Sequence, residues 1–247
     1  MTADLTGKAA IITGAAQGLG RAIAQAYSDA GMRLALLDVN ASDLRQAADE
    51  LAKTDTQCEP IVVDLSDAEA TQQAIDQAID QLGTPRILIH NAAILIARPM
   101  VELKLADWQR EVNVGIQAAF LMSKAVWPLM VAAGEGSIVY VSSMSGIKGF
   151  DGESAYCTTK HGLEGLMKCL AIEGKHVNIA VNTITPGMYM KTPMSERNYP
   201  EELKQKWVDP ILLTPAFVHL AAQDAGGITG QRLNAWELSQ TLTATDP

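Results

Sequence analysis

The sequence contains few cysteines and few aromatic residues. Its three cysteines, Cys58, Cys157 and Cys169, are an odd number without metal-ligand spacing. That pattern is typical of reduced thiols and not of a disulfide framework or a zinc site. We therefore expect a cytoplasmic protein without a bound metal. Because aromatic residues make up only 5% of the chain and hydrophobic residues 48%, the core must consist mainly of aliphatic side chains, as in buried parallel strands.

Basic residues and long apolar runs are also scarce. The chain has 19 Lys and Arg against 28 Asp and Glu, a net charge of −9, and such a surface repels phosphate backbones and anionic membranes. The N-terminus lacks the charged-then-apolar order of a signal peptide. The apolar stretch Ile87–Ala97 is far shorter than the ~20 residues of a membrane helix. We expect neither a nucleic-acid nor a membrane partner.

Short apolar segments alternate with helix-like segments along the whole chain. The predicted strands are Ala9–Thr13, Leu34–Leu37, Ile61–Val63, Ile87–His90, Ile138–Val141 and Ile179–Ile184. Helical spacing is clearest over Ala41–Ala52 and Ala68–Leu82. Continuous apolar strands separated by amphipathic helices predict βαβ units. The fold class is therefore α/β, a doubly wound parallel sheet with helices on both faces, in a single domain over residues 1–247.

One segment interrupts this alternation, at about 188–210. It contains Pro193, Pro200 and Pro210 around the polar segment Glu201–Trp207. Inserted after the sixth strand, it would overhang the carboxyl ends of the strands, where open α/β sheets bind ligands. A substrate lid and a plain surface excursion are both open; we favour the lid.

A glycine-rich turn follows the first predicted strand. It reads Thr13-Gly14-Ala15-Ala16-Gln17-Gly18-Leu19-Gly20 and leads into a helix-like run. Glycines let the backbone approach a pyrophosphate closely, and the helix N-terminus directs free N–H groups at the phosphates. This order of strand, glycines and helix predicts a dinucleotide site.

Asp38 ends the second predicted strand and indicates which dinucleotide is bound. A carboxylate at this position accepts hydrogen bonds from ribose hydroxyls and repels the additional phosphate of NADP. Neither Gln17 nor Val39 offers a compensating cation. We therefore expect NAD. Asp64 follows the third strand and could bond the adenine amino group, although Asp is also common there as a turn residue.

Tyr156 and Lys160 lie four residues apart in a helix-like run that reaches Gly174, so both side chains share one helix face. A nearby ammonium favours a phenolate and can lower the pKa of the phenol. Ser143 follows the fifth strand, where its hydroxyl can bond a substrate oxygen while Tyr156 moves the proton.

These pieces together resemble the short-chain dehydrogenase/reductase family, in its shorter branch and over essentially the whole chain. The matching motifs are Thr13-Gly14-x-x-x-Gly18-x-Gly20, Asp64-Leu65, Asn91-Ala92-Ala93, Ser143, Tyr156-x-x-x-Lys160 and Pro186-Gly187. The resemblance implies a Rossmann fold, Tyr156 as acid/base, Ser143 as substrate anchor, and Lys160 on the nicotinamide ribose. It also implies a homo-oligomer, usually a tetramer. The expected cofactor-binding residues are Gly14, Gln17, Gly18, Leu19, Gly20, Asp38, Asp64, Leu65, Asn91, Ala92, Tyr156, Lys160, Pro186, Gly187 and Met188.

The chain departs from the family pattern most sharply at Gly115. The family's catalytic asparagine is expected seven residues after Trp108 and five before Phe120, and both spacings lead to Gly115. Asn113 is two positions early, a rotation of ~200° on a helix. We hypothesise that the asparagine's part in the proton relay is missing or taken over by water, and that activity is reduced.

Three further departures are smaller. His90 stands where the family usually has Asn, and without ligand-spaced partners we interpret it as structural. Thr192 lies one residue later than the family's nicotinamide-contacting threonine. Residues 230–236 replace the usual Val-Asp-Gly-Gly ending.

The sequence thus predicts an NAD-dependent oxidoreductase that interconverts a secondary alcohol or polyol and its carbonyl, a small-molecule substrate. The expected substrate-side residues are mostly apolar: Ser145, Ile147, Phe150, Met188, Tyr189 and Met194. Two alternatives remain open. One is a non-catalytic or weakened NAD-binding regulatory protein, which Gly115 favours. The other is an NAD-using epimerase or dehydratase, for whose substrate domain the chain has little room.

Overall fold

Seven parallel strands form one sheet in the order β3-β2-β1-β4-β5-β6-β7. The computed structural model describes residues 4–54 and 56–245; the ends of the predicted domain 1–247 lie outside the described residues. The strands are β1 (Ala9–Thr13), β2 (Arg33–Asp38), β3 (Cys58–Val62), β4 (Pro85–His90), β5 (Gly136–Val141), β6 (Ile179–Thr185) and β7 (Arg232–Asn234). The six predicted strands are all present, and the short edge strand β7 is an addition that the sequence analysis missed.

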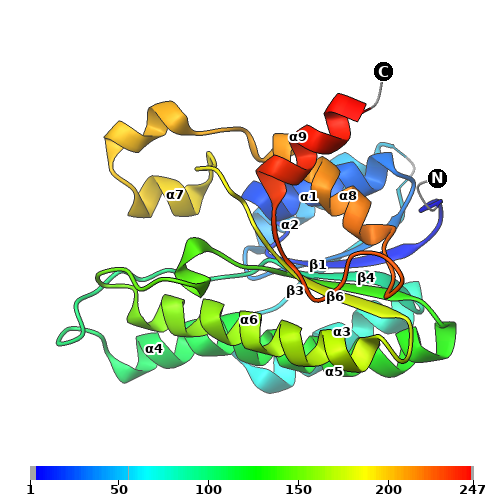
Figure 1. Ribbon diagram of the computed structural model, residues 1–247, viewed down its shortest axis with the longest axis horizontal. Coiled ribbons are helices and arrows are strands. Elements are labelled where there is room, and N and C mark those ends of the chain that lie inside the picture. The colour runs from blue at the N-terminus through cyan, green and yellow to red at the C-terminus, as the bar shows by residue number, and fades with distance from the viewer. Residues whose placement is uncertain (1–3, 55, 246–247) are drawn as a thin grey trace.

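Helices cover both faces of the sheet, as Figure 1 shows. One layer consists of α1 (Gly18–Asp29), α2 (Ala41–Ala52), α8 (Thr214–Ala221) and α9 (Ala235–Thr245). The other consists of α3 (Ala68–Leu82), α4 (Leu105–Val112), α5 (Ala118–Ala133) and α6 (Ser154–Gly174). Every residue of β4, β5 and β6 is buried, because a parallel sheet in this position has no face toward water. The predicted doubly wound fold is confirmed.

Capping residues set the ends of the helices that apolar spacing predicts. Asn40 begins α2 by accepting a hydrogen bond from the Asp43 amide, and Asp67 begins α3 in the same manner. Gly83, with φ +73°, ends α3, in a conformation that other residues rarely adopt.

The most extended apolar helix is Leu105–Ala133, which comprises α4, a π-helical turn η1 (Asn113–Gln117) and α5. By length and composition it could cross a membrane. Its Met122, Val126 and Met130 are buried in the cluster between the sheet and α3. Packing in the core therefore accounts for the apolar character of this helix.

The chain between β6 and α8 departs from the two layers. It contains α7 (Pro193–Asn198) and the 3₁₀ turns η3 (Glu201–Lys206) and η4 (Pro210–Leu213), and α7 stands away from the sheet in Figure 1. Connections lead from β1 and β4 to opposite faces, so the adjacent ends of these two strands form the crevice in which such folds bind ligands.

Candidate active site

A cleft of about 1460 Å³ lies at the carboxyl ends of the strands. It brings together all but one of the predicted cofactor and catalytic residues. Those that line it are Gly14, Gln17, Gly18, Leu19, Asp38, Asp64, Leu65, Asn91, Ala92, Ser143, Tyr156, Lys160, Pro186, Gly187 and Met188. Gly20 does not line it. Of the predicted substrate residues, Ile147 is the exception, being half exposed and outside the cleft, because the 3₁₀ turn η2 (Met144–Gly146) directs the chain away.

Gly20 does not line the cleft but packs against the backbone of Gly14 at the start of the glycine-rich turn. A Cβ on Gly20 would lie 2.1 Å from the Gly14 carbonyl oxygen, so only glycine permits this close approach of α1 to the end of β1. The N-terminus of α1 then faces the cleft with unpaired N–H groups, which favour an anionic ligand such as a pyrophosphate.

Asn91 and Thr13 hold the same turn in place. The Asn91 side-chain amide donates to the carbonyl oxygens of Thr13 (3.0 Å) and Gly14 (3.1 Å). The Thr13 hydroxyl accepts from the amides of Asn91 and Ala92, both at 3.0 Å. These bonds join the ends of β1 and β4, and so fix the width of the crevice.

The Asp38 carboxylate is anchored by backbone amides at the mouth of the cleft. One oxygen accepts from the Ala16 amide at 3.0 Å and the other from the Asn40 amide at 2.9 Å. Each oxygen retains a lone pair for a ribose hydroxyl. Asp64 is held in a similar way: it accepts from the Ser66 amide at 2.9 Å, and this bonding lowers its pKa.

The segment after β6 forms another wall of the cleft. A Cβ on Gly187, which has φ +78°, would lie 1.8 Å from Asn234 Oδ1, so the chain needs glycine to pass the end of β7. Thr192 accepts from the Ser195 amide at the start of α7. Its Cγ2 would lie 3.2 Å from a Cβ on Gly18, which places Thr192 directly over the glycine-rich turn.

Tyr156 and Lys160 project into the cleft from the first turns of α6. Lys160 is 2% exposed; its Nζ donates to the Val141 carbonyl oxygen at 2.7 Å and lies 5.3 Å from the Tyr156 ring centroid. The Ser143 hydroxyl, at the end of β5, accepts from the Ser145 amide at 3.2 Å. The three residues therefore converge on one wall of the cleft.

The expected lowering of the Tyr156 pKa is not found. Burial raises this pKa, the charges of Tyr199 and Glu153 raise it further, and hydrogen bonding to Ser143 lowers it. Burial also lowers the pKa of Lys160 to about 8. A lysine with its own charge disfavoured by desolvation is a weaker stabiliser of a phenolate than the sequence argument assumed.

Known proteins resemble this chain over nearly its full length. The family model described as short chain dehydrogenase matches residues 8–203. The oxidoreductase UcpA of Escherichia coli is 33% identical over 258 residues, which cover 98% of this chain and 97% of that protein. The D-threitol dehydrogenase of Mycolicibacterium smegmatis is 37% identical over 182 residues, which cover 74% of this chain and 70% of that protein.

A crystal structure from Beutenbergia cavernae, described as a proposed NAD(P)-dependent gluconate 5-dehydrogenase with NADP bound at low occupancy, has the same fold. Its TM-score is 0.86 at 29% identity, and the alignment covers 95% of this chain and 98% of that chain. This chain belongs to the short-chain dehydrogenase family.

Membership of the short-chain dehydrogenase family brings a nicotinamide cofactor, and the cleft fits one. The passage between Gly14 and Gly20 admits no Cβ, and Asp38 lines the mouth of the cleft. The described residues contain no group of three His, Cys, Asp or Glu side chains that could hold a metal ion.

Gly115, in place of the family's asparagine, lies inside the π-helical turn η1. Its carbonyl oxygen bonds His90 Nε2 at 2.9 Å, and His90 Nδ1 bonds the Thr13 hydroxyl at 3.2 Å. Asn113 donates to the Ser66 carbonyl oxygen at 3.0 Å, outside the cleft, as the helical rotation predicts. His90 therefore connects β1, β4 and η1 and has both ring nitrogens engaged.

A side chain at position 115 would collide with Thr159, so Gly115→Asn tests packing as well as catalysis. A Cβ on Gly115 would lie 2.0 Å from Cγ2 of Thr159, which is 2% exposed. We expect Gly115→Asn alone to lower the free energy of unfolding by about 1–3 kcal/mol, because buried side chains would overlap. Adding Thr159→Ser removes the methyl group and should recover most of the loss in urea unfolding. A single variant as stable as the wild type would refute this packing argument.

A second prediction concerns pH and His90. Burial and the Lys160 charge lower the His90 pKa to about 4, so the folded protein holds a neutral ring that the unfolded chain protonates below about pH 6.5. This contribution to stability is complete above pH 6.5 and is lost as the pH falls toward 4, by about 3 kcal/mol. Urea unfolding of His90→Asn should lack this part of the pH dependence, whereas the exposed control His176→Asn should retain it. Parallel pH curves for wild type and His90→Asn would contradict the prediction.

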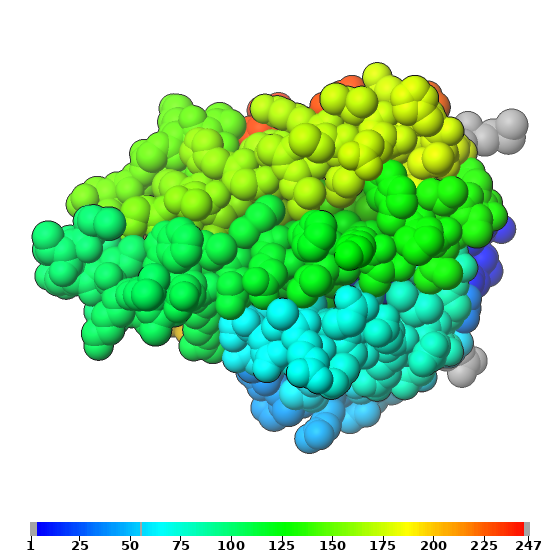
Figure 2. Space-filling view, turned by 90° about the horizontal axis from the view of Figure 1, so that it is seen from below, coloured from blue at the N-terminus to red at the C-terminus, as the bar shows by residue number. Residues whose placement is uncertain are grey.

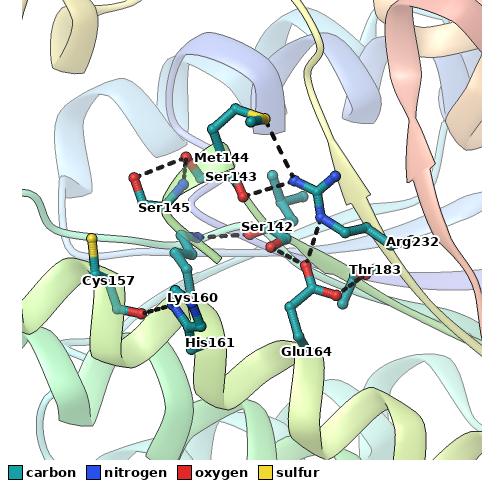
Figure 3. Close-up of polar contacts among 11 residues, drawn as sticks. Ser142, Ser143, Met144, Ser145, Cys157, Lys160, His161, Glu164, Thr183 and Arg232 are labelled. Atoms are coloured by element: carbon teal, nitrogen blue, oxygen red, sulfur yellow. Dashed lines mark hydrogen bonds and ion pairs between the residues drawn. The ribbon is translucent and has the colours of Figure 1, made fainter. Parts of the chain in front are cut away.

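An ion pair between Glu164 and Arg232 lies beside Lys160 and Ser143, as Figure 3 shows. Glu164, one turn beyond Lys160 on α6, accepts from Ser142 Oγ (2.5 Å), Thr183 Oγ1 (2.7 Å) and Arg232 Nε (3.2 Å). Arg232 Nη2 also donates to the Ser143 carbonyl oxygen at 2.9 Å. Arg232 thus joins β7 to α6 and to the backbone of Ser143.

The sequence analysis missed four charged residues of this region, namely Arg232, Glu164, Glu153 and Glu111. Arg232 fell in the unexplained segment 230–236, and its partner Glu164 is far away in sequence. Glu153 precedes α6 and lines the cleft. Glu111 is 1% exposed, and neither carboxylate oxygen has a hydrogen-bond partner among the described residues. For Glu111, the only sequence signal was its place in the helix pattern, where an apolar residue is expected.

Proposed function

We propose that the chain is an NAD-dependent oxidoreductase that interconverts a secondary alcohol or polyol and its carbonyl by hydride transfer. The observation that supports this most strongly is the convergence of Ser143, Tyr156 and Lys160 on the cleft that also contains the glycine-rich turn and Asp38. A dinucleotide at one end and a proton-transferring group at the other are what the reaction needs.

Each residue has a proposed role. The glycine-rich turn and Asp38 would hold the cofactor, which would supply the hydride acceptor for the carbinol carbon in oxidation. Ser143 holds the carbinol oxygen, and Tyr156 Oη removes its proton as the carbonyl forms; in reduction Tyr156 returns the proton. Lys160, fixed by the Val141 carbonyl, binds the nicotinamide ribose and keeps a positive charge beside the phenol, which favours the phenolate.

The reaction is tested by following reduced nicotinamide formation with secondary alcohols and polyols, each with NAD and with NADP. Alcohol-dependent turnover is expected, faster with NAD. Tight cofactor binding without any turnover would reject the proposal and favour the alternative that Gly115 suggests, a non-catalytic or weakened NAD-binding regulatory protein.

NAD preference is proposed from Asp38. Its carboxylate would bond the ribose hydroxyls and repel the additional phosphate of NADP. Neither Val39, which follows it in the chain, nor Gln17, which follows its hydrogen-bond partner Ala16, supplies a cation. The Beutenbergia cavernae relative is described as NAD(P) dependent and holds NADP at low occupancy, so the preference must be measured with both cofactors.

We expect Asp38→Asn to reduce the NAD to NADP ratio of kcat/KM by about tenfold or more, because the repulsion disappears and one ribose acceptor is lost. The matched control is Asp49→Asn, an exposed position on α2, which should leave the ratio unchanged. An unaltered ratio in Asp38→Asn would show that another residue selects the cofactor.

We also propose a homotetramer assembled through helix pairs, a substrate lid formed by residues 188–210, and a cytoplasmic location. The face in Figure 2 is built largely from α3 to α6, and Phe120 of α5 and Ile172 of α6 are exposed large apolar side chains. The lid is supported by Met188, Tyr189 and Met194, which line the cleft. The three cysteines are unpaired, as is usual in a reducing compartment. Light scattering would test the tetramer.

A further inference from the structure

The substrate end of the cleft contains a carboxylate for which no reaction step has been assigned. Glu153 lines the cleft beside Tyr156. One of its oxygens accepts from Ser145 Oγ at 2.8 Å, and Ser145 is itself 4% exposed. Among the described residues, no Lys or Arg forms an ion pair with Glu153. Its charge and its second oxygen are therefore free to interact with a ligand.

The surroundings of Glu153 are also negative. Burial raises the pKa values of Tyr156 and Tyr199 most, and the Glu153 charge raises both further, so Glu153 lies close to both phenols. Burial raises the pKa of Glu111 most, and the charges of Asp107 and Glu153 raise it further, so Glu111 adds a second acidic group near Glu153. Glu153 itself lines the cleft, and its carboxylate, without a cation beside it in the described part of the chain, favours a ligand that supplies hydrogen-bond donors.

The lid adds aromatic groups to this region. Tyr189 and Tyr199 line the cleft, and their rings meet edge to face with centroids 5.7 Å apart. Carboxylate acceptors beside aromatic faces bind hydroxyl or ammonium donors well. The same groups repel a carboxylate, because two like charges in a confined site raise each other's energy.

We propose that Glu153 and Ser145 form a subsite that selects substrates with a second hydrogen-bond donor, a hydroxyl or an ammonium group, near the reacting carbinol. Substrates that carry a carboxylate there are rejected. This inference rests on the proposed alcohol oxidation and narrows its substrate class from alcohols in general to diols or amino alcohols. Glu153 would act in binding and orientation, not in proton transfer.

The experiment compares four substrates that differ in one group: 2-butanol, 2,3-butanediol, 3-amino-2-butanol and 3-hydroxybutyrate. For the wild type we expect kcat/KM for the diol or the amino alcohol to exceed that for 2-butanol by about tenfold or more, with the hydroxy acid lowest. In Glu153→Leu this ratio should fall toward one, mainly through a higher KM for the donor-bearing substrate. The control is Asp49→Leu, which removes an exposed carboxylate on α2 outside the cleft and should leave the ratio unchanged.

Glu153→Gln distinguishes a hydroxyl donor from an ammonium donor on the substrate. The amide keeps a hydrogen-bond acceptor but loses the negative charge. Diol selectivity that persists in Glu153→Gln identifies a hydroxyl ligand, and amino-alcohol selectivity that is lost identifies an ammonium. Equal kcat/KM for 2-butanol and the donor-bearing substrates, unaffected by Glu153→Leu, overturns the inference and leaves the proposed reaction intact.

No turnover of any alcohol with either cofactor would instead reject the proposed reaction. The subsite is then decided by saturation-transfer NMR of the same four compounds. Binding of the diol or amino alcohol that is weakened in Glu153→Leu supports the subsite, and binding that Glu153→Leu does not alter overturns it.

Discussion

Tyr156→Phe is expected to lower kcat for alcohol oxidation by about 10²- to 10⁴-fold, the usual contribution of a positioned acid/base. Phe preserves the ring that lies over Lys160 (5.3 Å from Nζ to the ring centroid) and removes only the hydroxyl that exchanges the substrate proton. Cofactor affinity should change little, because the glycine-rich turn and Asp38 are contributed by other elements. Steady-state kinetics and a cofactor titration by fluorescence measure the two quantities.

The control for Tyr156→Phe removes a phenolic hydroxyl from the core. Tyr140 is fully buried, and its hydroxyl bonds Ser123 Oγ at 2.6 Å. Tyr140→Phe should lower the free energy of unfolding by about 1 kcal/mol and retain turnover. If Tyr156→Phe retained the kcat of the wild type, the assignment of Tyr156 as acid/base would be wrong, and water or another group would have to carry the proton.

Arg232→Leu is expected to cost about 3–5 kcal/mol of stability, because it leaves the Glu164 carboxylate buried without its cation. The Glu164 side chain is 7% exposed and that of Arg232 25%. The same change removes the donor from the Ser143 carbonyl oxygen, so we expect a lower kcat as well. Chemical unfolding and steady-state kinetics measure the two effects.

A double variant separates the ion pair from the positioning of Ser143. Glu164→Leu with Arg232→Leu removes both charges, which often restores stability. If Arg232 positions Ser143, kcat should remain low in the double variant although stability returns. Arg232→Lys is the conservative control, because lysine keeps the charge but lacks the planar fork that reaches Glu164 and Ser143 together. Full activity in the double variant would show that the pair contributes to stability alone.

Much of the fold follows directly from local sequence. The bounds Ala41–Ala52 and Ala68–Leu82 are those of α2 and α3, because apolar periodicity and the capping residues Asn40 and Asp67 are contiguous in the chain. Local sequence likewise predicts four features of the site: the glycine-rich turn, Asp38, Tyr156 and Lys160. Each lies within one strand–turn–helix unit or within one helix turn.

Other features could not be read from the sequence because they depend on residues far apart in it. The strand β7 has only three residues and pairs with β6, too short for a periodic signal. Gly115 approaches Thr159 closely where η1 meets α6. A side chain at position 115 would overlap Thr159, so packing as well as catalysis bears on the missing asparagine. The pKa of Tyr156 depends on burial and on Tyr199 and Glu153, not only on the lysine four residues away.

The sequence by itself determined the fold class, the family resemblance and most of the residues that line the cleft. These are encoded in local spacing, since hydrogen-bonded strands and helices repeat every few residues. Only the tertiary structure decided the charge balance of the site. The Glu164–Arg232 pair, the buried Glu111 and the open carboxylate of Glu153 come from elements that meet only when the sheet and its helices pack. Electrostatic interactions depend on distance in space and on exclusion of water, and neither is a property of sequence position.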